Sequence, residues 1–546
     1  MILTLSSPLS SPHFGLCLSS PRSPLALALC LCLCLCLCLC LSLSLSLTHT
    51  HRLSLTHTHT HTHSLSLTFS TQSQQKCIAV FGLLCCSAVL LALIFSSVDF
   101  WGEDEDGITE ENCSFKCRIV MVENIPGELD LQPVGEGTLP LTVGLHGLLD
   151  MAKRSVEIVS PHWTLSSMEQ QSDHFSANEG QRVFERLLGL KSRGVKLKVT
   201  NSLTDSAELS TLAANNAQIH YVNMTAYTKG HLHSSFWVVD RNHIYIGSAG
   251  MDWRSLAKRK ELGVLLYNCS CLALDLHRIF SFYWQLHEKD YIPSIWSRRV
   301  TALYSRDEPL SLQLNGTHAS AYMSTSPGLF CPKDRTRDVE AIHRVIQEAQ
   351  QFIYVSVTDY LPLVNRTSQE QHVTRYWSAI DEALREALVL RQVTVRLLVS
   401  LWERTHPYTF NFLTSLSSLC MRLMDCHLEV KFFSTDDALR ARRDNRALNH
   451  NKYMVTDSAV YIGNLDWVGN EFTFNAGAGL VIQPTAEHPE DRPAILNQMK
   501  AAFERDWFSW YARSLQEVMA QTGSALKTPA LSLVKRGMSG RERGGK

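Results

Sequence analysis

The sequence lacks an excess of charge of either sign. Its 51 lysine and arginine residues are balanced by 52 aspartate and glutamate residues, and charged residues make up 19% of the chain. Binding of nucleic acid through bulk positive charge is therefore excluded, although a local basic groove is not. With 45% hydrophobic residues and 546 residues in all, the composition is that of a globular protein of about two to four domains.

The first 75 residues have low sequence complexity. Residues 29–40 alternate Leu and Cys, residues 41–47 alternate Leu and Ser, and residues 57–63 alternate His and Thr. Dinucleotide repeats translate into such patterns, so we interpret residues 1–75 as a low-complexity segment that is disordered or an artefact of gene prediction. A metal-binding histidine tract and a palmitoylated cysteine tract are the alternative interpretations.

One long apolar run follows the low-complexity segment. Residues 77–97 carry no charged side chain, and about 20 such residues suffice for a helix to cross the hydrocarbon core of a bilayer. We therefore predict a single transmembrane helix, with a cleaved signal peptide and a buried core helix as alternatives. Lys76 precedes the run whereas Asp99 and Glu103 follow it, which favours a cytosolic N-terminus on the evidence of few charges.

The topology that follows is that of a single-pass type II membrane protein. Everything after the run is then expected in the lumen of the endoplasmic reticulum, Golgi or endolysosomal route. Sequons for N-glycosylation beyond the run agree with that prediction, although single sequons are common by chance. They are Asn112, Asn223, Asn268, Asn315 and Asn365.

Seven cysteines lie beyond the run, where an oxidising lumen would allow disulfides. Their spacing suggests two local pairs, Cys113 with Cys117 and Cys269 with Cys271. Zinc binding by the same four residues is the alternative, but a Cys-x-Cys spacing is poor for zinc, and we predict no metal site. The odd count leaves at least one thiol free or paired between chains.

The region after residue 113 contains one α/β domain pattern twice. Strand-like and helical segments recur in the same order in residues 113–300 and 320–511, which predicts two halves, each with a mixed sheet flanked by helices. A repeat this long is a duplicated domain, and we expect the halves to pack with pseudo-twofold symmetry. The strand-like segments are residues 155–160, 195–199, 219–222, 262–266, 352–357, 393–398, 428–432 and 476–480, and the helical ones are 180–192 and 377–390. The basic tail, residues 524–546, is expected to be disordered.

Each half contains one copy of a histidine motif followed by a glycine-rich stretch. The first copy, within residues 227–254, consists of His233, Ser235, Asp240 and Gly250. The second copy, within residues 444–470, consists of His450, Lys452, Asp457 and Asp466. A lone histidine would be interpreted as an ordinary core residue, but two full contexts with parallel spacing favour a paired site.

Both copies resemble the HxKxxxxD signature of the phospholipase D superfamily, whose glycine-rich stretch ends in Asn. The resemblance implies that one motif from each half meets at a single site. One histidine of such a site attacks phosphorus and the other protonates the leaving group, while two lysines and two asparagines bind the phosphate. His233 and His450 occupy the two histidine positions. Asp240 and Asp457 are expected to hold the imidazoles in the useful tautomer.

The phosphate-binding set of that signature is incomplete. Ser235 replaces a lysine, Gly250 removes an amide donor, and Asp466 adds a carboxylate where negative charge should develop. Losing one preorganised donor lowers the rate about 10²–10³-fold, and like charges about 4 Å apart repel by roughly 4 kcal/mol. We therefore predict a catalytically inactive pseudoenzyme. An active phosphodiesterase with a phosphohistidine intermediate is the alternative, and a structural or adhesive domain with a closed cleft is a third.

Two residues outside the signature are further candidates for the site. Glu261 is positioned to orient an imidazole, with Asn475 as its counterpart in the second half. An ordinary solvated acidic residue is an equally good interpretation of Glu261.

The resemblance extends beyond the signature to the vertebrate type II membrane phospholipase D group. It covers about residues 113–511 and is carried by residues 233–255, 261–276, 329–338, 449–457 and 461–470. That group holds lysosomal 5′-exonucleases acting on single-stranded nucleic acid and one inactive member, which the substitutions resemble. The resemblance implies a membrane glycoprotein without a cofactor that binds a luminal ligand or protein partner and can form a homodimer. Nucleic acid or a phospholipid is expected as a substrate only under the active alternative.

Overall fold

The computed structural model describes Gly82, Cys86, Ser87 and residues 107–525, apart from residues 136, 167–177, 203, 205, 288–290, 293–299, 333, 369–370, 422–424, 436–446 and 486–492. The predicted low-complexity segment 1–75, nearly all of the predicted span 77–97 and residues 526–546 lie outside this set. Of the helices described, none combines the length and the apolar character needed to cross a bilayer. Two compact units divide the chain, Met1–Leu91 and Ala92–Lys546, and both predicted halves belong to the second.

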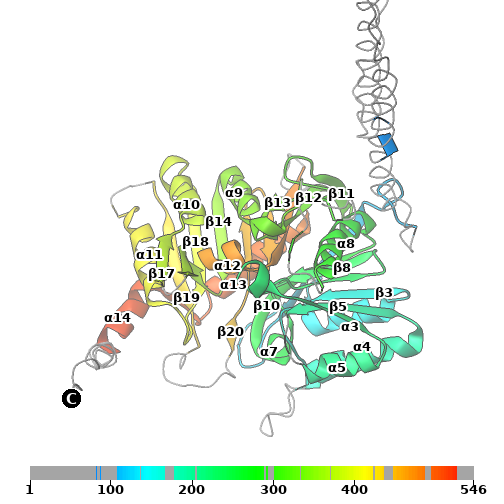
Figure 1. Ribbon diagram of the computed structural model, residues 1–546. Helices are drawn as coiled ribbons and strands as arrows, with labels where there is room; N and C mark the ends of the chain where they lie inside the picture. The colour runs from blue at the N-terminus through cyan, green and yellow to red at the C-terminus, as the bar shows by residue number, and fades with distance from the viewer. Residues whose placement is uncertain are drawn as a thin grey trace, which may run out of the picture. The chain divides into compact units, whose positions relative to one another are not determined.

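The first half is built on a mixed sheet of parallel and antiparallel strands (Figure 1). Its strands pair in the order β2-β1-β10-β8-β7-β3-β5-β6. Their bounds are β1 Lys116–Asn124, β2 Leu139–Pro140, β3 Ser155–Val159, β5 Lys196–Ser202, β6 Gln218–Val222, β7 Phe236–Val239, β8 His243–Gly247 and β10 Arg259–Tyr267. Both faces of β7 and β8 are buried, which explains their continuous apolar sequence.

The second half repeats this arrangement, with strands in the order β11-β12-β24-β22-β21-β14-β18-β19-β25. Their bounds are β11 Leu310–Leu314, β12 Thr317–Ser326, β14 Phe352–Val357, β18 Thr394–Ser400, β19 Leu428–Phe433, β21 Tyr453–Thr456, β22 Val460–Gly463, β24 Gly477–Pro484 and β25 Ala512–Ser514. Every predicted strand-like segment overlaps a strand of the first or the second half. The predicted mixed α/β fold is therefore confirmed.

Hydrogen bonds join the two half-sheets, so the prediction of two separate sheets is wrong. At one seam, β1 and β11 pair in parallel with Lys116 opposite Gln313. At the other, β10 pairs in parallel with β20 (Leu448–Asn449), with Arg259 opposite Leu448. Among the described residues, 19 strands form one continuous network. Short strands pair outside it: β4 Trp163–Thr164 with β9 Met251–Asp252, β15 Tyr360–Leu361 with β23 Trp467–Val468, and β16 Leu363–Ser368 with β17 Gln371–Tyr376.

Helices cover the sheets in layers, and the apolar core follows the layers. A central cluster holds α8 and α13 between the half-sheets, while outer clusters pack α3, α4 and α5 on the first half and α9, α10 and α11 on the second. Their bounds are α3 Leu141–Met151, α4 Asn178–Gly189, α5 Ala207–Ala214, α8 Ser270–Gln285, α9 Asp338–Glu348, α10 Ala379–Leu390, α11 Pro407–Ser418 and α13 Ala494–Trp507. The remaining helices are α6 Met224–Tyr227, α7 Trp253–Ala257, α12 Gly469–Phe474 and α14 Leu515–Ala525. Helix α14 includes residues 524–525, so the predicted disordered tail began too early.

Three disulfides occur among the described cysteines, and the prediction of two local pairs is wrong. The bonds are Cys113–Cys271, Cys117–Cys269 and Cys420–Cys426. The first two tie the start of β1 to the start of α8. These segments are neighbours because β1 pairs with β10, with Arg118 opposite Tyr267, and spacing along the chain does not reveal that pairing. The Cys331 thiol remains free, in line with the odd count.

Four buried charges hold α13 against the first-half sheet. The Lys260 ammonium on β10 has no exposed surface and lies 3.1 Å from the Glu123 carboxylate and 2.6 Å from the Asp506 carboxylate. Arg505 bonds both carboxylates, with its Nη1 2.8 Å from Glu123 Oε2 and its Nη2 2.7 Å from Asp506 Oδ1. Because an unpartnered buried charge is costly, this network favours one docking of the two halves over its alternatives.

The substitution Lys260→Met should therefore destabilise the protein strongly. It leaves two buried carboxylates with one guanidinium, and breaking a buried pair costs about 3–5 kcal/mol. Lys258→Met is the matched control, because Lys258 pairs with Glu128, which is 50% exposed, and such pairs contribute about 1 kcal/mol or less. The free energy of unfolding in urea measures both. Equal losses in the two variants would contradict the role assigned to the network.

Candidate functional site

The histidine of the first motif is positioned by the second half. His233 lies in the extended segment before β7, and its backbone N–H donates to the carbonyl of Ala476 at 2.8 Å. Its Nδ1–H donates to Oε2 of Glu471 on α12 at 2.7 Å. This hydrogen bond leaves Nε2 as the nitrogen available to a ligand, since a carboxylate only accepts.

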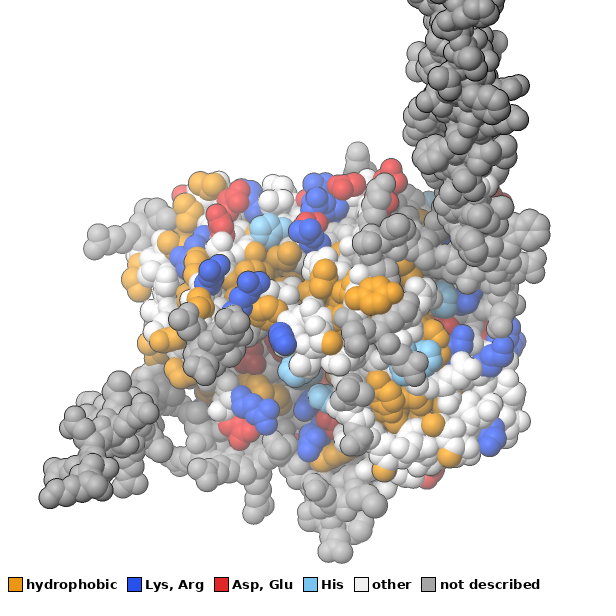
Figure 2. Space-filling model, viewed as in Figure 1, with side chains coloured by type: hydrophobic (Ala, Val, Ile, Leu, Met, Phe, Trp, Pro, Cys, Tyr) orange, Lys and Arg blue, Asp and Glu red, His pale blue; other side chains and the backbone are white. Residues whose placement is uncertain are grey.

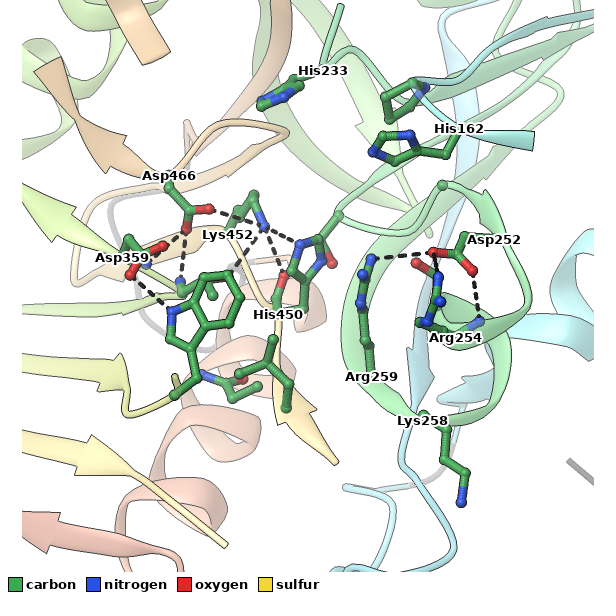
Figure 3. A pocket seen from close by; sticks show the side chains of 18 of the residues that line it. His162, His233, Asp252, Arg254, Lys258, Arg259, Asp359, His450, Lys452 and Asp466 are labelled. Carbon is green, nitrogen blue, oxygen red and sulfur yellow. Dashed lines mark hydrogen bonds and ion pairs between the residues drawn. The ribbon is translucent and has the colours of Figure 1, made fainter. Parts of the chain in front are cut away.

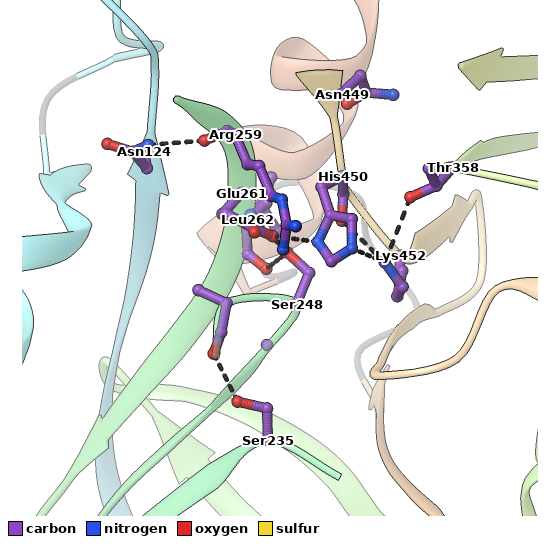
Figure 4. Close-up of polar contacts among 12 residues, drawn as sticks. Asn124, Ser235, Ser248, Arg259, Glu261, Leu262, Thr358, Asn449, His450 and Lys452 are labelled. Carbon is purple, nitrogen blue, oxygen red and sulfur yellow. Dashed lines mark hydrogen bonds and ion pairs between the residues drawn. The ribbon is translucent and has the colours of Figure 1, made fainter. Parts of the chain in front are cut away.

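The histidine of the second motif is positioned by the first half in the same way (Figure 4). The backbone N–H of His450 donates to the carbonyl of Lys260 at 2.8 Å. Its Nδ1–H donates to Oε2 of Glu261 on β10 at 3.0 Å, and the Ser248 hydroxyl donates to the same oxygen at 2.5 Å. Glu261 is fully buried, so it is a positioning residue rather than a solvated acid.

These contacts confirm one predicted positioning residue and add one that was not predicted. Glu261 orients an imidazole, as predicted. In the second half Glu471 makes the short contact with His233, and the predicted Asn475 also lies beside that ring, with its Nδ2 3.4 Å from His233 Nδ1. The Asn475 carboxamide also accepts a hydrogen bond from the backbone N–H of His231 at 2.8 Å. Glu471 was missed because it is 21 residues beyond His450 in the sequence and orients the histidine of the other motif.

The signature aspartates do not touch the imidazoles, so the role predicted for them is wrong. The Asp240 carboxylate accepts backbone N–H groups of Lys153, Arg154 and Ser155, each at 2.8 Å, immediately before and within β3. Asp457 does the same for residues 350–352 before β14, at 2.9–3.2 Å. Each aspartate therefore satisfies the donors of a turn that leads into the central strand of its half.

The two lysine positions of the signature differ completely. The Ser235 hydroxyl donates to the Ala249 carbonyl at 2.5 Å and is buried, so it offers nothing to the cleft. The Lys452 ammonium is present but engaged, because it donates to Nε2 of His450 at 3.1 Å and to Thr358 Oγ1 at 3.3 Å. It also lies 3.5 Å from the Asp466 carboxylate.

The two positions where the signature has Asn provide no amide. At Gly250 a Cβ would lie 3.3 Å from Ser160 Oγ and 3.6 Å from the Pro161 ring, so a side chain would need only a small shift there. Asp466 accepts backbone N–H groups of Thr358 and Asp359 at 2.8 and 3.1 Å, which places a carboxylate beside Lys452 (Figure 3). A further residue that sequence reasoning missed is Asn464, whose amide donates to the Ser235 and Gly247 carbonyls across the halves.

The environment shifts the pKa values of the two histidines in opposite directions. Burial lowers the pKa of His450, and the Lys452 ammonium lowers it further against the effect of Glu261. Burial also acts to lower the pKa of His233, but the Glu471 carboxylate outweighs it and the net pKa is raised. Burial together with the Asp466 carboxylate raises the pKa of Asp359 to about 7. The site therefore combines a neutral and a readily protonated imidazole.

A cavity of about 750 Å³ opens between the halves and contains these groups (Figures 2 and 3). First-half residues that line it include His162, Trp163 and Arg259, and the second half contributes Trp402 and Asp359. An open cavity contradicts the third hypothesis, which expected a closed cleft. Within the described part of the chain, no group of three or more His, Cys, Asp or Glu side chains is arranged to hold a metal ion.

Comparison with known proteins gives consistent matches. A sequence family described as "PLD3/4, PLD-like domain" matches residues 134–438. The chain is 50% identical over 480 residues to "Inactive phospholipase D5" of Mus musculus, covering 86% of this chain and 88% of that protein. It is 50% identical over 461 residues to the Homo sapiens protein of the same name, covering 83% and 84%. It is 40% identical over 422 residues to "5'-3' exonuclease PLD3" of Bos taurus, covering 76% and 84%.

The raised pKa of Asp359 predicts a loss of stability as the pH rises. The folded protein holds this proton more tightly than the unfolded chain, in which the carboxyl titrates near 3.8. The stability that the protonated Asp359 contributes to the folded state is full below that pH, and it is lost as the pH rises through about 7. The midpoint temperature of thermal unfolding of the parent should therefore fall between acid and neutral pH, relative to that of Asp359→Asn. Asp307→Asn, at a side chain that is 80% exposed, is the control and should track the parent.

Proposed function

Because the chain belongs to the phospholipase D family, we propose that its cleft binds a ligand or holds a partner without cleaving a phosphodiester bond. Its 50% identity to two proteins named inactive phospholipase D5 confirms the prediction of a catalytically inactive member. What the cleft binds is the part of the function that has to be proposed.

The observation that carries this proposal is the state of the phosphate-binding set. Ser235 is turned toward the Ala249 carbonyl, Gly250 has no side chain, and the remaining Lys452 ammonium faces the Asp466 carboxylate. A phosphoryl group between the two histidines would therefore meet one neutralised cation instead of two lysines and two amides. Since one lost donor costs about 10²–10³ in rate, three losses remove useful turnover even where they do not add fully.

The machinery that positions the histidines is complete, which keeps the cleft shaped for a ligand. His233 and His450 each retain a carboxylate partner from the opposite half, at 2.7 and 3.0 Å. A domain selected only for structure would not need two oriented imidazoles around a cavity of about 750 Å³. This geometry supports binding, and it is also the one feature that favours residual phosphodiesterase activity.

We further propose that the chain is a single-pass type II membrane glycoprotein with residues after 97 in the lumen of the secretory or endolysosomal route. The apolar run 77–97 and its flanking charges support this topology. The sequons also support it, because Asn112, Asn268 and Asn365 are exposed. Asn223 is half-buried, and Asn315 is exposed but has its carboxamide bonded to Ile119. A homodimer is proposed from the family resemblance alone.

The proposed inactivity is tested on the purified full chain with single-stranded DNA and a chromogenic phosphodiester. We expect no turnover by the parent. Combining Ser235→Lys, Gly250→Asn and Asp466→Asn should restore turnover, because these changes add one lysine and two amides and remove the carboxylate beside Lys452. Adding His450→Ala to that variant should abolish it again.

Turnover by the parent that disappears in His450→Ala would contradict the proposal. A silent parent together with a silent triple variant would leave inactivity standing but place its cause outside these three positions. Circular dichroism and thermal unfolding of each variant separate a lost site from a lost fold.

Glycosylation tests the proposed topology. The Asn365 side chain is exposed on β16, whereas the Asn315 carboxamide is bonded to both backbone groups of Ile119, at 3.0 and 2.9 Å. We expect Asn365→Gln to remove one glycan from protein made in mammalian cells, while Asn315→Gln changes the mass much less. Glycosidase digestion followed by mass measurement compares the two. A parent that carries no glycan would refute the luminal placement.

A further inference from the structure

Charged side chains divide the cavity into two walls of opposite sign. On the wall formed by the first half, three cationic residues accompany a single carboxylate, and these residues are Arg254, Lys258, Arg259 and Asp252. On the wall formed by the second half, four carboxylates accompany two cationic residues, and these residues are Asp359, Glu403, Asp466, Glu471, Lys452 and Arg404. An anion that enters the cavity is therefore attracted to the first-half wall and repelled by the other.

Arg259 is the cation on this wall that lies nearest the histidine centre. Figure 3 shows its guanidinium between His450 and Asp252, and Figure 4 shows it beside the pair of His450 and Glu261. Its ion pair is a loose one, because Nη1 lies 3.7 Å from the Asp252 carboxylate. The side chain is 26% exposed, so a ligand can reach it.

Two other groups on this wall are hydrogen-bond donors without an acceptor. Nε of Arg254 and the indole N–H of Trp163 are buried and have no partner among the described residues. Trp163 is 4% exposed and lines the cavity. Leaving a buried donor unpaired is unfavourable, and native structures contain few such groups, so an acceptor from outside the described residues, a water molecule or a ligand oxygen, would satisfy them.

We infer that Arg254, Arg259 and Trp163 form a subsite for the oxyanion group of a ligand, displaced from the two-histidine centre onto the first-half wall. Guanidinium groups present paired N–H donors that match phosphate, sulfate and carboxylate oxygens. The inference rests on the proposed function, a cleft that binds without cleaving, and deepens it by naming the charge and the place of the bound group.

The histidine centre itself is a poor alternative for the same anion. Lys452 donates to His450 and to Thr358, and the Asp466 carboxylate lies 3.5 Å from its ammonium. A carboxylate lies beside the cations of both sites, since Asp252 is 3.5 Å from Arg254 and 3.7 Å from Arg259. The difference is that the Lys452 ammonium is also bonded to His450 and Thr358, whereas the Arg259 guanidinium has only its loose ion pair among the contacts of the described residues. The displaced subsite therefore places an anion within the cleft but away from the position where a phosphodiester would be attacked.

Calorimetric titration of the purified full chain with inorganic phosphate tests the subsite, with sulfate and acetate as parallel probes of the oxyanion. Arg259→Gln should weaken phosphate binding about 10- to 100-fold, as expected for a charged hydrogen bond, and Trp163→Phe about 2- to 10-fold. Arg404→Gln is the matched control on the opposite wall, where that guanidinium faces Glu403 and is 68% exposed. It should leave the affinity unchanged, whereas Lys452→Gln reports binding at the histidine centre.

Each result decides between the subsite and its alternatives. Loss of phosphate affinity in Arg259→Gln but not in Lys452→Gln supports the displaced subsite. Loss in Lys452→Gln without loss in Arg259→Gln places the anion at the histidine centre and overturns the inference. Absence of binding by all three anions also overturns it. None of these results depends on the turnover assay, so the proposed inactivity stands or falls separately.

Discussion

The hydrogen-bonded seam between β10 and β20 is the constraint on which the site depends. Four consecutive residues at the start of β10 make the contacts. The carbonyls of Lys258 and Lys260 accept hydrogen bonds from the backbone N–H groups of Leu448 and His450. The next side chain, Glu261, orients the imidazole that the seam has brought to it. The Lys260 side chain points the other way, into the buried charges that hold α13. One short stretch therefore fixes the docking of the halves and the geometry of the cleft together.

The substitutions that remove catalysis leave this seam intact. Ser235, Gly250 and Asp466 occupy positions that would face a phosphate, and none of them belongs to the contacts between β10 and β20 or to the charge network. An active set would gather two lysines and two protonatable imidazoles around an empty cleft, which is an unfavourable arrangement of like charges. Here Asp466 lies beside Lys452, and the Ser235 hydroxyl donates a hydrogen bond to a backbone carbonyl. Inactivity is thus compatible with a stable fold, as trade-offs between activity and stability lead one to expect.

The sequence alone allowed the duplicated α/β order, both histidines and the altered phosphate-binding set to be predicted, because motif spacing and strand periodicity are local properties. Contacts between the halves were out of reach. The partnership of Glu471 with His233 and the crossing of Cys113 to Cys271 join segments that are far apart in the chain and adjacent only after the sheets have paired. The role of Asp457 was mistaken because its backbone partners at residues 350–352 belong to another strand, and only the pairing of β14 with β21 brings them together.

The continuity of the sheet across both halves has a consequence for how a ligand enters. In many two-lobed proteins the lobes rotate about a flexible connection, and closure completes the pocket around the ligand. Such a rotation would here break strand pairing at β1–β11 and β10–β20 and would pull each imidazole from the carboxylate that holds it. Ligand binding should therefore involve little conformational change in the protein. Its reorganisation cost is then low, and its affinity depends closely on the shape of the ligand.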